Sequence, residues 1–394
     1  MKVLVLSSLA WSLVNFRGRL LTDLRDAGHD VIACAPDDDP AVRARLAQMG
    51  VGFALTPMDR AGTNPLADLM TLARYVALML RERPDVVIAY TQKPIVLGGI
   101  AARIARISRF HVLMSGLGYV FSDAAAGRRL LRWATCRAYR IAVARAATIF
   151  VFNGDDRREM IAHGIIGTSH YVVQVPGSGV DIEHFAARPL PEGRPTFLMI
   201  ARLMRDKGIG EFVEAARLVR DHRTDARFQL VGRPEPANPT GIGDAEIARW
   251  VDAGLIEHIP ETRDVRPYLA AAHVFVLPSY YREGLPRTLL EALASGRPVI
   301  TTDLPGCREP VIPGVNGWLV PPRDAPALAA TMLRTIADRG VLAAMARAAR
   351  ERAVTHYDVA KVNAQLLAIM HLDRPSPRPG AEIPVAAPAL AAEG

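Results

Sequence analysis

Two glutamates of the segment EGLPRTLLE, Glu283 and Glu291, have seven residues between them. Gly284 marks a turn, and Pro286 suits a position near the first turn of a helix because its missing N–H would be unpaired there anyway. Such a helix start presents unpaired backbone donors and a positive dipole end, which suits a diphosphate. Glutamates at this spacing are more often solvated side chains of an amphipathic helix, so the surrounding motifs have to decide.

A second candidate site is the segment LMRDKG, which follows an apolar strand and contains Arg202 and Lys207. Two cations in a strand-to-helix loop could bind the phosphates of a nucleotide and stabilise a departing diphosphate. The sequence contains only four lysines, so an ammonium retained here among many arginines suggests a point-charge role. A solvated basic loop is the alternative for either residue alone.

The composition is that of a globular protein with two domains. The chain has 394 residues, of which 50% are hydrophobic and 22% charged, with a net charge of +8. Three scattered cysteines exclude a disulfide framework and a cysteine-based zinc site, and they favour a reducing compartment. No basic-aromatic motif of a nucleic-acid module occurs.

The N-terminal apolar run lacks a small-residue cleavage site, so we predict a strand followed by a loop there. No apolar run in the sequence is long enough to cross a bilayer.

Short apolar runs alternate with helical patterns in both halves of the chain, which predicts an α/β fold with parallel sheets covered on both faces. The predicted strands are 2–8, 30–36, 85–90, 111–116, 147–153, 171–177, 196–202, 227–232, 256–260, 274–279 and 298–303. The predicted helices include 20–27, 40–49, 66–82, 98–105 and 354–372. A Pro-rich stretch at 188–195 separates two halves of similar size. Ligands of such sheets bind at the carboxyl ends of the strands, which is where both candidate motifs fall.

We expect four parts along the chain. Residues 1–187 form an acceptor-binding Rossmann-like domain, and residues 188–352 form a nucleotide-sugar-binding one facing it across a cleft. A closing helix (353–373) returns to the first domain. The tail (374–394), rich in Pro and Ala, is predicted to be disordered.

Two further loops of the second half complete the pattern. The segment TTDLPGCREPV places Gly306 and Glu309 after a strand, and VNGW predicts a tight turn around Gly317. Each motif alone is weak, but their order and spacing together are specific.

Together these motifs resemble the carboxyl-terminal domain of glycosyltransferase family 4, over residues 194–372. The resemblance implies the GT-B fold of two facing Rossmann-like domains. It also implies a UDP-sugar donor, transfer with retention of anomeric configuration, and no metal or other cofactor. In this family Arg202 and Lys207 would hold the donor diphosphate, Glu291 the ribose hydroxyls, and Glu283 the transferred sugar. The implied catalytic residues are Glu283, Lys207 and Arg202, and the implied donor-binding residues are Gly284, Leu285, Arg287, Thr288 and Glu291.

The first half is similar to enzymes that build polyprenyl-diphosphate-linked oligosaccharides, such as the N-acetylgalactosaminyl α1,3-transferases of bacterial N-glycosylation. The similarity lies in SLVNFRG, the stretch 60–65, YTQKP and SGLGYVF. A lipid diphosphate acceptor would account for cations in these motifs. The acceptor-binding residues that we expect are Arg17, Arg60, Asn64, Lys93 and Gly116.

The sequence departs from the family where many members carry a histidine at the end of the strand predicted at 111–116. Ser115 and Gly116 occupy that place, and His111 comes earlier, so we expect a core or edge histidine there. Because that histidine is missing, Glu283 becomes the stronger candidate for the residue that contacts the transferred sugar. The acidic run at 37–39 is expected to be solvated, and no metal site is expected.

The segment 128–145 carries arginines without any acidic residue and includes Trp133. A basic amphipathic helix with a tryptophan can lie on an anionic membrane surface, and an ordinary Arg-rich surface helix is equally consistent. The expected location is therefore cytoplasmic, peripheral at the inner face of the plasma membrane. The expected process is cell-surface polysaccharide or glycan biosynthesis, such as that of an O-antigen or exopolysaccharide.

Competing functions remain at this point. A nucleotide-sugar epimerase or a phosphorylase could use the same fold, although no lysine stands in an apolar strand where a phosphorylase would need one. A dehydrogenase lacks its G-x-G-x-x-G fingerprint here. A non-catalytic module that binds a nucleotide sugar is the third possibility.

Overall fold

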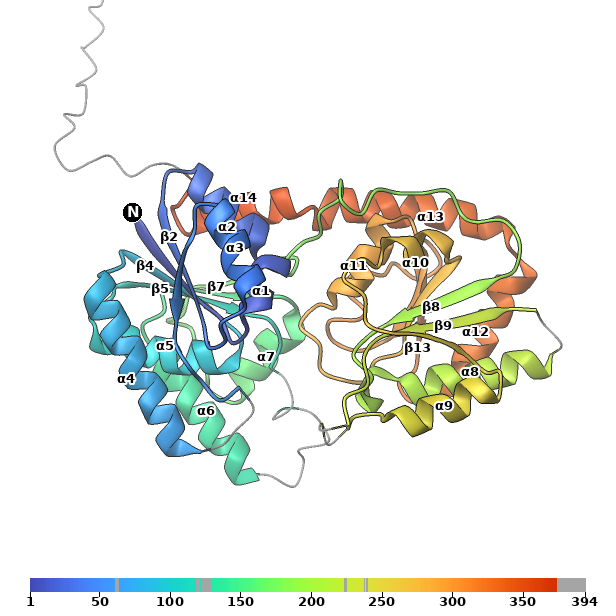
Figure 1. Ribbon diagram of the computed structural model, residues 1–394, viewed down its shortest axis with the longest axis horizontal. Coiled ribbons are helices and arrows are strands. Elements are labelled where there is room, and N and C mark those ends of the chain that lie inside the picture. Colours follow the sequence, from blue (N-terminus) through green and yellow to red (C-terminus); the bar gives the residue numbers. More distant parts are fainter. Residues whose placement is uncertain are drawn as a thin grey trace, which may run out of the picture.

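The computed structural model describes residues 1–60, 64–117, 121, 129–222, 225–236, 238 and 240–373. The tail (374–394) and parts of the stretches 60–65, 115–121 and 128–145 therefore lie outside the described residues. Two α/β domains lie side by side, and the carboxyl-terminal helices run from the second domain to the first (Figure 1).

Within the described residues the first domain has a seven-stranded parallel sheet in the order β3-β2-β1-β4-β5-β6-β7. Its strands are β1 (Lys2–Leu6), β2 (Asp30–Ala35), β3 (Gly52–Leu55), β4 (Val86–Tyr90), β5 (Arg109–Met114), β6 (Thr148–Val151) and β7 (Val172–Gln174). Its helices are α1 (Ala10–Asn15), α2 (Gly18–Asp26), α3 (Pro40–Gln48), α4 (Pro65–Glu82), α5 (Gln92–Ile104), α6 (Arg129–Val143) and α7 (Gly154–Ala162).

The two faces of this sheet carry separate cores. One core contains side chains of α1, α2, α3 and the carboxyl-terminal helix α14 (Val359–Ile369). The other contains side chains of α4, α5, α6 and α7. Strand β4 is buried at every residue, because helices cover both faces of the sheet, and its sequence is accordingly a continuous apolar run.

The second domain has a six-stranded parallel sheet in the described part, in the order β10-β9-β8-β11-β12-β13. Its strands are β8 (Thr196–Ile200), β9 (Arg227–Val231), β10 (Glu257–Ile259), β11 (Val274–Leu277), β12 (Val299–Thr302) and β13 (Gly317–Val320). Its helical segments are η3 (Arg205–Lys207), α8 (Ile209–Asp221), α9 (Asp244–Asp252), α10 (Arg266–Ala271), α11 (Arg287–Ala294), α12 (Ala325–Ala337), α13 (Gly340–Arg352) and the π-helical turn η4 (Ala353–Tyr357).

The chain passes between the domains twice, and the two passages pair with each other. The Val180 N–H donates to the Tyr357 carbonyl at 2.7 Å, and the Val359 N–H donates to the Val180 carbonyl at 3.0 Å. Phe185 packs into the core of the second domain, whereas Val362 and the residues after it pack into the first. The two connections therefore share one narrow crossing.

Two segments differ from the sequence-based prediction. Residues Ala10–Asn15 form helix α1 where we predicted a loop, because Ala10 and Leu13 are buried and Ser12 bonds the Tyr90 hydroxyl at 2.9 Å. The predicted tight turn is present just before Gly317, where the Gly314 N–H donates to the Gly317 carbonyl at 2.9 Å. Gly317 itself begins strand β13, which we did not predict and which pairs in parallel with β12. In both cases tertiary contacts determine the structure of a short segment.

His111 lies inside β5 and is a core histidine, with 3% of its surface exposed. Neither of its ring nitrogens has a hydrogen-bond partner among the described residues. Burial, together with the positive charge of Arg109, lowers the pKa of His111 to about 4. The imidazole is therefore neutral at physiological pH.

This burial predicts a pH-dependent loss of stability. Between pH 6.5 and 4 the unfolded chain binds a proton at His111 and the folded protein does not, so the free energy of unfolding falls as the pH falls. From pH 7 to pH 5 this contribution amounts to about 2 kcal/mol. Urea denaturation should show a smaller decrease over this range for His111→Leu than for the wild type, and equal decreases would contradict the assignment.

Candidate active site at the domain interface

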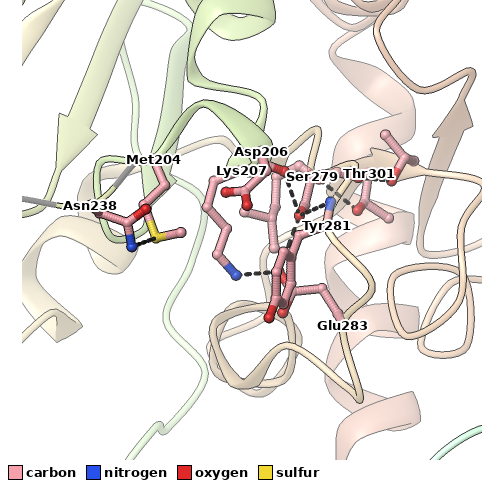
Figure 2. Close-up of polar contacts among 10 residues, drawn as sticks. Met204, Asp206, Lys207, Asn238, Ser279, Tyr281, Glu283 and Thr301 are labelled. Carbon is pink, nitrogen blue, oxygen red and sulfur yellow. Dashed lines mark hydrogen bonds and ion pairs between the residues drawn. The ribbon is translucent and has the colours of Figure 1, made fainter. Parts of the chain in front are cut away.

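The loops after β8 and β11 bring Lys207 and Glu283 together. Lys207 ends the 3-10 turn η3, and its ammonium forms an ion pair with Glu283 Oε1 (Figure 2). The two side chains are only 14% and 11% exposed. Lys207 Nζ also lies 5.2 Å from the centre of the Tyr281 ring, in a cation–π contact. Two residues that are 76 positions apart thus form one charged unit.

Neighbouring groups fix the carboxylate and the loop that carries it. The Ser279 hydroxyl lies 3.1 Å from Glu283 Oε1 and 3.2 Å from the Asp206 carbonyl oxygen, with geometry for donation to either. The same carbonyl accepts the backbone N–H groups of Tyr280 and Tyr281, both at 2.9 Å. The loop after β11 is therefore attached to the turn that carries Lys207.

Arg202 lies on the open side of this cluster. Its side chain is exposed, and its charge, like that of Lys207, favours the ionised form of Asp206. Burial nevertheless raises the pKa of Asp206, and Glu283 raises it further. The position of Arg202 at the rim is compatible with contact to an incoming anion.

Helix α11 carries Arg287 and Glu291 one turn apart. Arg287 Nε lies 3.0 Å from Glu291 Oε1, and Glu291 is 9% exposed. Burial raises the pKa of Glu291 to about 7, although the charge of Arg287 opposes this shift. Pro286 is the N-cap and Arg287 the first helical residue, and no side chain caps this end. Thr288 is half-buried in the first turn, so backbone donors there are available to a ligand.

Gly116 and Gly284 bring the backbones of the two domains into contact. A Cβ atom added to Gly116 would lie 2.8 Å from the Gly284 nitrogen, and one added to Gly284 would lie 2.2 Å from the Ser115 carbonyl oxygen. Gly116 also has a φ of +113°, which disfavours any side chain. Next to them, Leu285 packs against both domain cores. The loop after β5 thus meets the Glu283 loop directly.

Arg17 is a buried cation at the same interface. It is 3% exposed, and its guanidinium carbon lies 5.1 Å from the centre of the Tyr90 ring and 5.8 Å from that of Phe152. Burial, together with the nearby charge of Arg287, lowers the pKa of Arg17 to about 10, so it stays charged at neutral pH. No carboxylate pairs with Arg17 in the described part of the chain. Arg287 in turn donates to the Asn15 carbonyl and stacks on Phe16 at 5.3 Å.

The other predicted acceptor residues are not brought to this cluster. Lys93 forms a 2.6 Å ion pair with Asp68 of α4. Asn64 caps α4 by accepting the Leu66 N–H at 3.0 Å, and Arg60 is exposed in the loop after β3. They form a separate polar region near the starts of α4 and α5.

Sequence reasoning missed Asp206, Ser279 and Asn153. Asn153 follows the buried strand β6 and donates to the Gly284 carbonyl oxygen across the interface at 2.9 Å. A polar residue directly after an apolar strand was the available signal. Glu309 was noted and is partly buried, which raises its pKa, and its Oε2 has no hydrogen-bond partner among the described residues.

Among the described residues, no group of three or more His, Cys, Asp or Glu side chains could hold a metal ion. No described helix is both long and apolar enough to cross a membrane.

Helix α6 presents apolar and basic side chains to solvent. Leu130 is 78% exposed and Trp133 62%, and both stand near its first turn. Exposed arginines follow along the helix and just beyond it, at Arg129, Arg137, Arg140 and Arg145. Helix α4, which like α6 packs on α5, exposes Leu66, Leu69 and Met70. Both helices precede parallel strands, so their N-terminal ends lie at the carboxyl ends of the sheet (Figure 1).

Both halves of the chain match families of known proteins. Residues 15–177 match the family described as glycosyl transferase 4-like domain, and residues 194–338 match the glycosyl transferases group 1. The N,N'-diacetylbacillosaminyl-diphospho-undecaprenol alpha-1,3-N-acetylgalactosaminyltransferase of Campylobacter jejuni is 24% identical over 370 residues, which are 90% of this chain and 95% of that protein. The UDP-Gal:alpha-D-GlcNAc-diphosphoundecaprenol alpha-1,3-galactosyltransferase of Escherichia coli is 25% identical over 312 residues, which are 75% of this chain and 77% of that one.

Among solved structures, Anabaena HepE in complex with UDP and glucose is similar to this chain with a TM-score of 0.75 and 20% identity. The similarity covers 94% of this chain and 99% of that one. The lipopolysaccharide outer core galactosyltransferase WaaB is similar with a TM-score of 0.67 and 17% identity, over 94% and 99% of the two chains. This likeness establishes the GT-B architecture.

The Lys207–Glu283 pair predicts strong energetic coupling. Lys207→Met or Glu283→Gln leaves the other charge in a poorly hydrated place, so each should lower the free energy of unfolding by about 2–4 kcal/mol. The double variant removes both charges and should lose less than the sum of the two. Urea denaturation of all four proteins measures the coupling. The exposed Arg217–Glu214 pair, treated in the same way, is the control and should show coupling below about 1 kcal/mol. Additive losses at Lys207 and Glu283 would contradict the pairing.

Proposed function

Because the chain belongs to glycosyltransferase family 4 and has the GT-B fold, we propose that it transfers a hexose or N-acetylhexosamine from a UDP-sugar to a lipid-diphosphate-linked saccharide. Transfer occurs with retention of anomeric configuration, in the synthesis of a bacterial cell-surface polysaccharide or glycan. The observation that carries this proposal is the Lys207–Glu283 pair, enclosed where the second domain meets the backbone of Gly116.

The second domain binds the donor in this proposal. Lys207 and Arg202 contact the diphosphate, and the uncapped start of α11 at Arg287 and Thr288 adds backbone donors. Glu291 accepts hydrogen bonds from the ribose hydroxyls. Glu283, next to Gly284 and Leu285, contacts the sugar itself. The UDP bound in the similar HepE structure supports a uridine nucleotide.

The first domain binds the acceptor. Arg17 is a buried cation without a carboxylate partner in the described residues, and it faces the donor side, so it suits an anionic group at the centre of the interface. Arg60, Asn64 and Lys93 form the outer acceptor region. Two relatives named for diphospho-undecaprenol acceptors support a lipid diphosphate as the anchor.

Catalysis is then positioning and charge stabilisation. The bond between the sugar C1 and the phosphate oxygen breaks, and its electron pair stays on the diphosphate, which Lys207 and Arg202 stabilise. The acceptor hydroxyl oxygen forms the new bond to C1 on the same face and gives its proton to the departing phosphate. Glu283 holds the sugar and keeps Lys207 in place.

Helices α6 and α4 keep the enzyme at the membrane that contains the acceptor. The exposed apolar residues at their N-terminal ends enter the headgroup region, and the exposed arginines of α6 contact anionic lipid. The enzyme is thus peripheral, at the inner face of the cytoplasmic membrane.

A product assay decides the proposed activity. UDP-hexoses and UDP-N-acetylhexosamines are first screened by thermal shift, and those that stabilise the protein are incubated with polyprenyl-diphosphate-linked sugars. A new glycolipid supports transfer. Binding without a product would favour the non-catalytic alternative, and a changed nucleotide sugar would favour the epimerase.

Loss of either member of the charged pair should abolish transfer. Glu283→Ala and Lys207→Ala are expected to reduce kcat by at least about 10²-fold because each removes a charge that acts on the departing diphosphate or the sugar. Circular dichroism should still report a folded protein. Arg205→Ala is the matched control, since Arg205 belongs to the same turn but has an exposed side chain that pairs with Glu246. Wild-type turnover by either site variant would overturn the assignment.

Membrane binding should depend on α6. Arg129→Gln with Arg137→Gln is expected to weaken binding to vesicles containing phosphatidylglycerol by about 2 kcal/mol, roughly 30-fold, at low salt. Trp133→Ser should weaken it as well, whereas Val251→Ser, an exposed apolar position on the second domain, should not. Vesicle co-sedimentation measures this, and unchanged binding by the α6 variants would refute the surface.

A further inference from the structure

Asn153 joins the two domains through a fully buried side chain. It follows β6 and is the N-cap of α7, with 0% of its surface exposed. Its Oδ1 accepts the Asp156 N–H at 2.7 Å. Its Nδ2 donates to Asp156 Oδ2 at 3.0 Å and to the Gly284 carbonyl oxygen at 2.9 Å. The amide oxygen therefore accepts one hydrogen bond, and the amide NH2 group donates two.

These bonds require an amide. The cap needs an oxygen that accepts, and the other two contacts need N–H groups that donate, which only Asn or Gln supplies. The three partners also fix which side of the amide is nitrogen, because in a flipped side chain the single amide oxygen would face the Gly284 carbonyl and the Asp156 carboxylate, and the NH2 group would face the Asp156 N–H. The amide therefore points its donor at the Gly284 carbonyl in one orientation.

The carbonyl that Asn153 holds belongs to the residue directly after Glu283. Contacts within the second domain also fix this loop. The Ser279 hydroxyl hydrogen-bonds the Glu283 carboxylate, and Gly306 packs against the Glu283 backbone. At Gly284 itself, the Ser115–Gly116 backbone of the first domain restricts the space, and the Asn153 amide binds the carbonyl directionally. Asn153 is thus placed to set the orientation of the Glu283 peptide only when the domains are together.

A second contact joins the same two segments but lies further from the carboxylate. Glu159, also on α7, forms a 3.2 Å ion pair with Arg282, and both side chains are more than a quarter exposed. This pair adds to the docking of α7 on the loop without touching the Gly284 backbone. It offers a way to weaken the interface without changing the orientation of Glu283.

We propose that Asn153 is a positioning residue for sugar transfer, which couples the docking of the first domain to the orientation of Glu283. The proposal rests on the proposed role of Glu283. Asn153 itself does not touch the donor: its amide holds the Gly284 carbonyl, and this fixes the loop in which Glu283 faces the sugar. The acceptor domain then contributes to catalysis through a residue of its own, in addition to binding the acceptor.

The test separates this role from capping. Asn153→Ser keeps an oxygen at the N-cap, where serine is as good as asparagine, but removes the amide donor to Gly284. We expect kcat of Asn153→Ser to fall roughly 10- to 100-fold because a buried carbonyl loses its partner and the loop its orientation. The dissociation constant for UDP should stay within about twofold, since the second domain supplies those contacts. The thermal midpoint should fall by roughly a few degrees, because the Gly284 carbonyl and the Asp156 carboxylate each lose a donor.

Glu159→Gln is the matched control. It weakens the same interface at an exposed ion pair, so kcat should change by less than about threefold. Wild-type kcat in Asn153→Ser would overturn the proposal, as would an equal loss in Glu159→Gln, which would indicate a general effect of domain docking. The role of Glu283 is checked separately. If Glu283→Ala is inactive and Asn153→Ser is fully active, only the coupling fails, whereas an active Glu283→Ala contradicts the proposed function.

Discussion

One ammonium and one carboxylate, Lys207 and Glu283, are held together where two domains meet and little water can reach them. In such a place an ion pair is costly to break, because either charge alone would lack both water and a partner. The pair therefore holds the loop after β8 to the loop after β11. Ser279 and the Asp206 carbonyl strengthen the same connection. The remaining site geometry follows from this fixed unit.

Two guanidinium groups, those of Arg17 and Arg287, lie close to each other near that unit. Arg17 is buried on two aromatic faces, and Arg287 lies near it while pairing with Glu291. Burial lowers the pKa of Arg17 and raises that of Glu291, so the donor-free protein stores unfavourable electrostatic energy here. In the proposed donor complex a nucleotide diphosphate would relieve it, because its negative charge would compensate for the Arg17 guanidinium. The arrangement favours an anion over a neutral ligand.

The first domain contributes backbone as well as side chains. Gly116 lets its loop approach Gly284 so closely that any side chain at either position would clash. Next to this contact the Asn153 amide donates a hydrogen bond to the Gly284 carbonyl, and Leu285 packs against the apolar core of the first domain. Because the crossing at Val180 and Val359 is narrow, these contacts between the strand ends are important in setting how the domains face each other.

Local sequence was sufficient where the signal was long or repeated. Alternating apolar strands and amphipathic helices predicted the two parallel-sheet domains, because burial on both faces requires continuous apolar runs such as β4. It was insufficient for α1 and β13, whose short segments take their structure from contacts with distant strands. The same limit applies to the site. The motifs indicated that Lys207 and Glu283 lie in loops after strands and that Arg287 and Glu291 lie in the helix that follows, but they did not indicate which of these charges pair.

The sequence by itself thus determined the fold class and the group of residues at the carboxyl ends of the second sheet, since strand order along the chain and parallel pairing place those loops together. Only the tertiary structure decided which charges pair, that Arg17 joins the donor side while Lys93 pairs with Asp68, and that Asn153 reaches Gly284. Those contacts join residues far apart in the chain, and their existence depends on side-chain burial and on the closeness of two backbones. Neither quantity is encoded in the spacing of a motif.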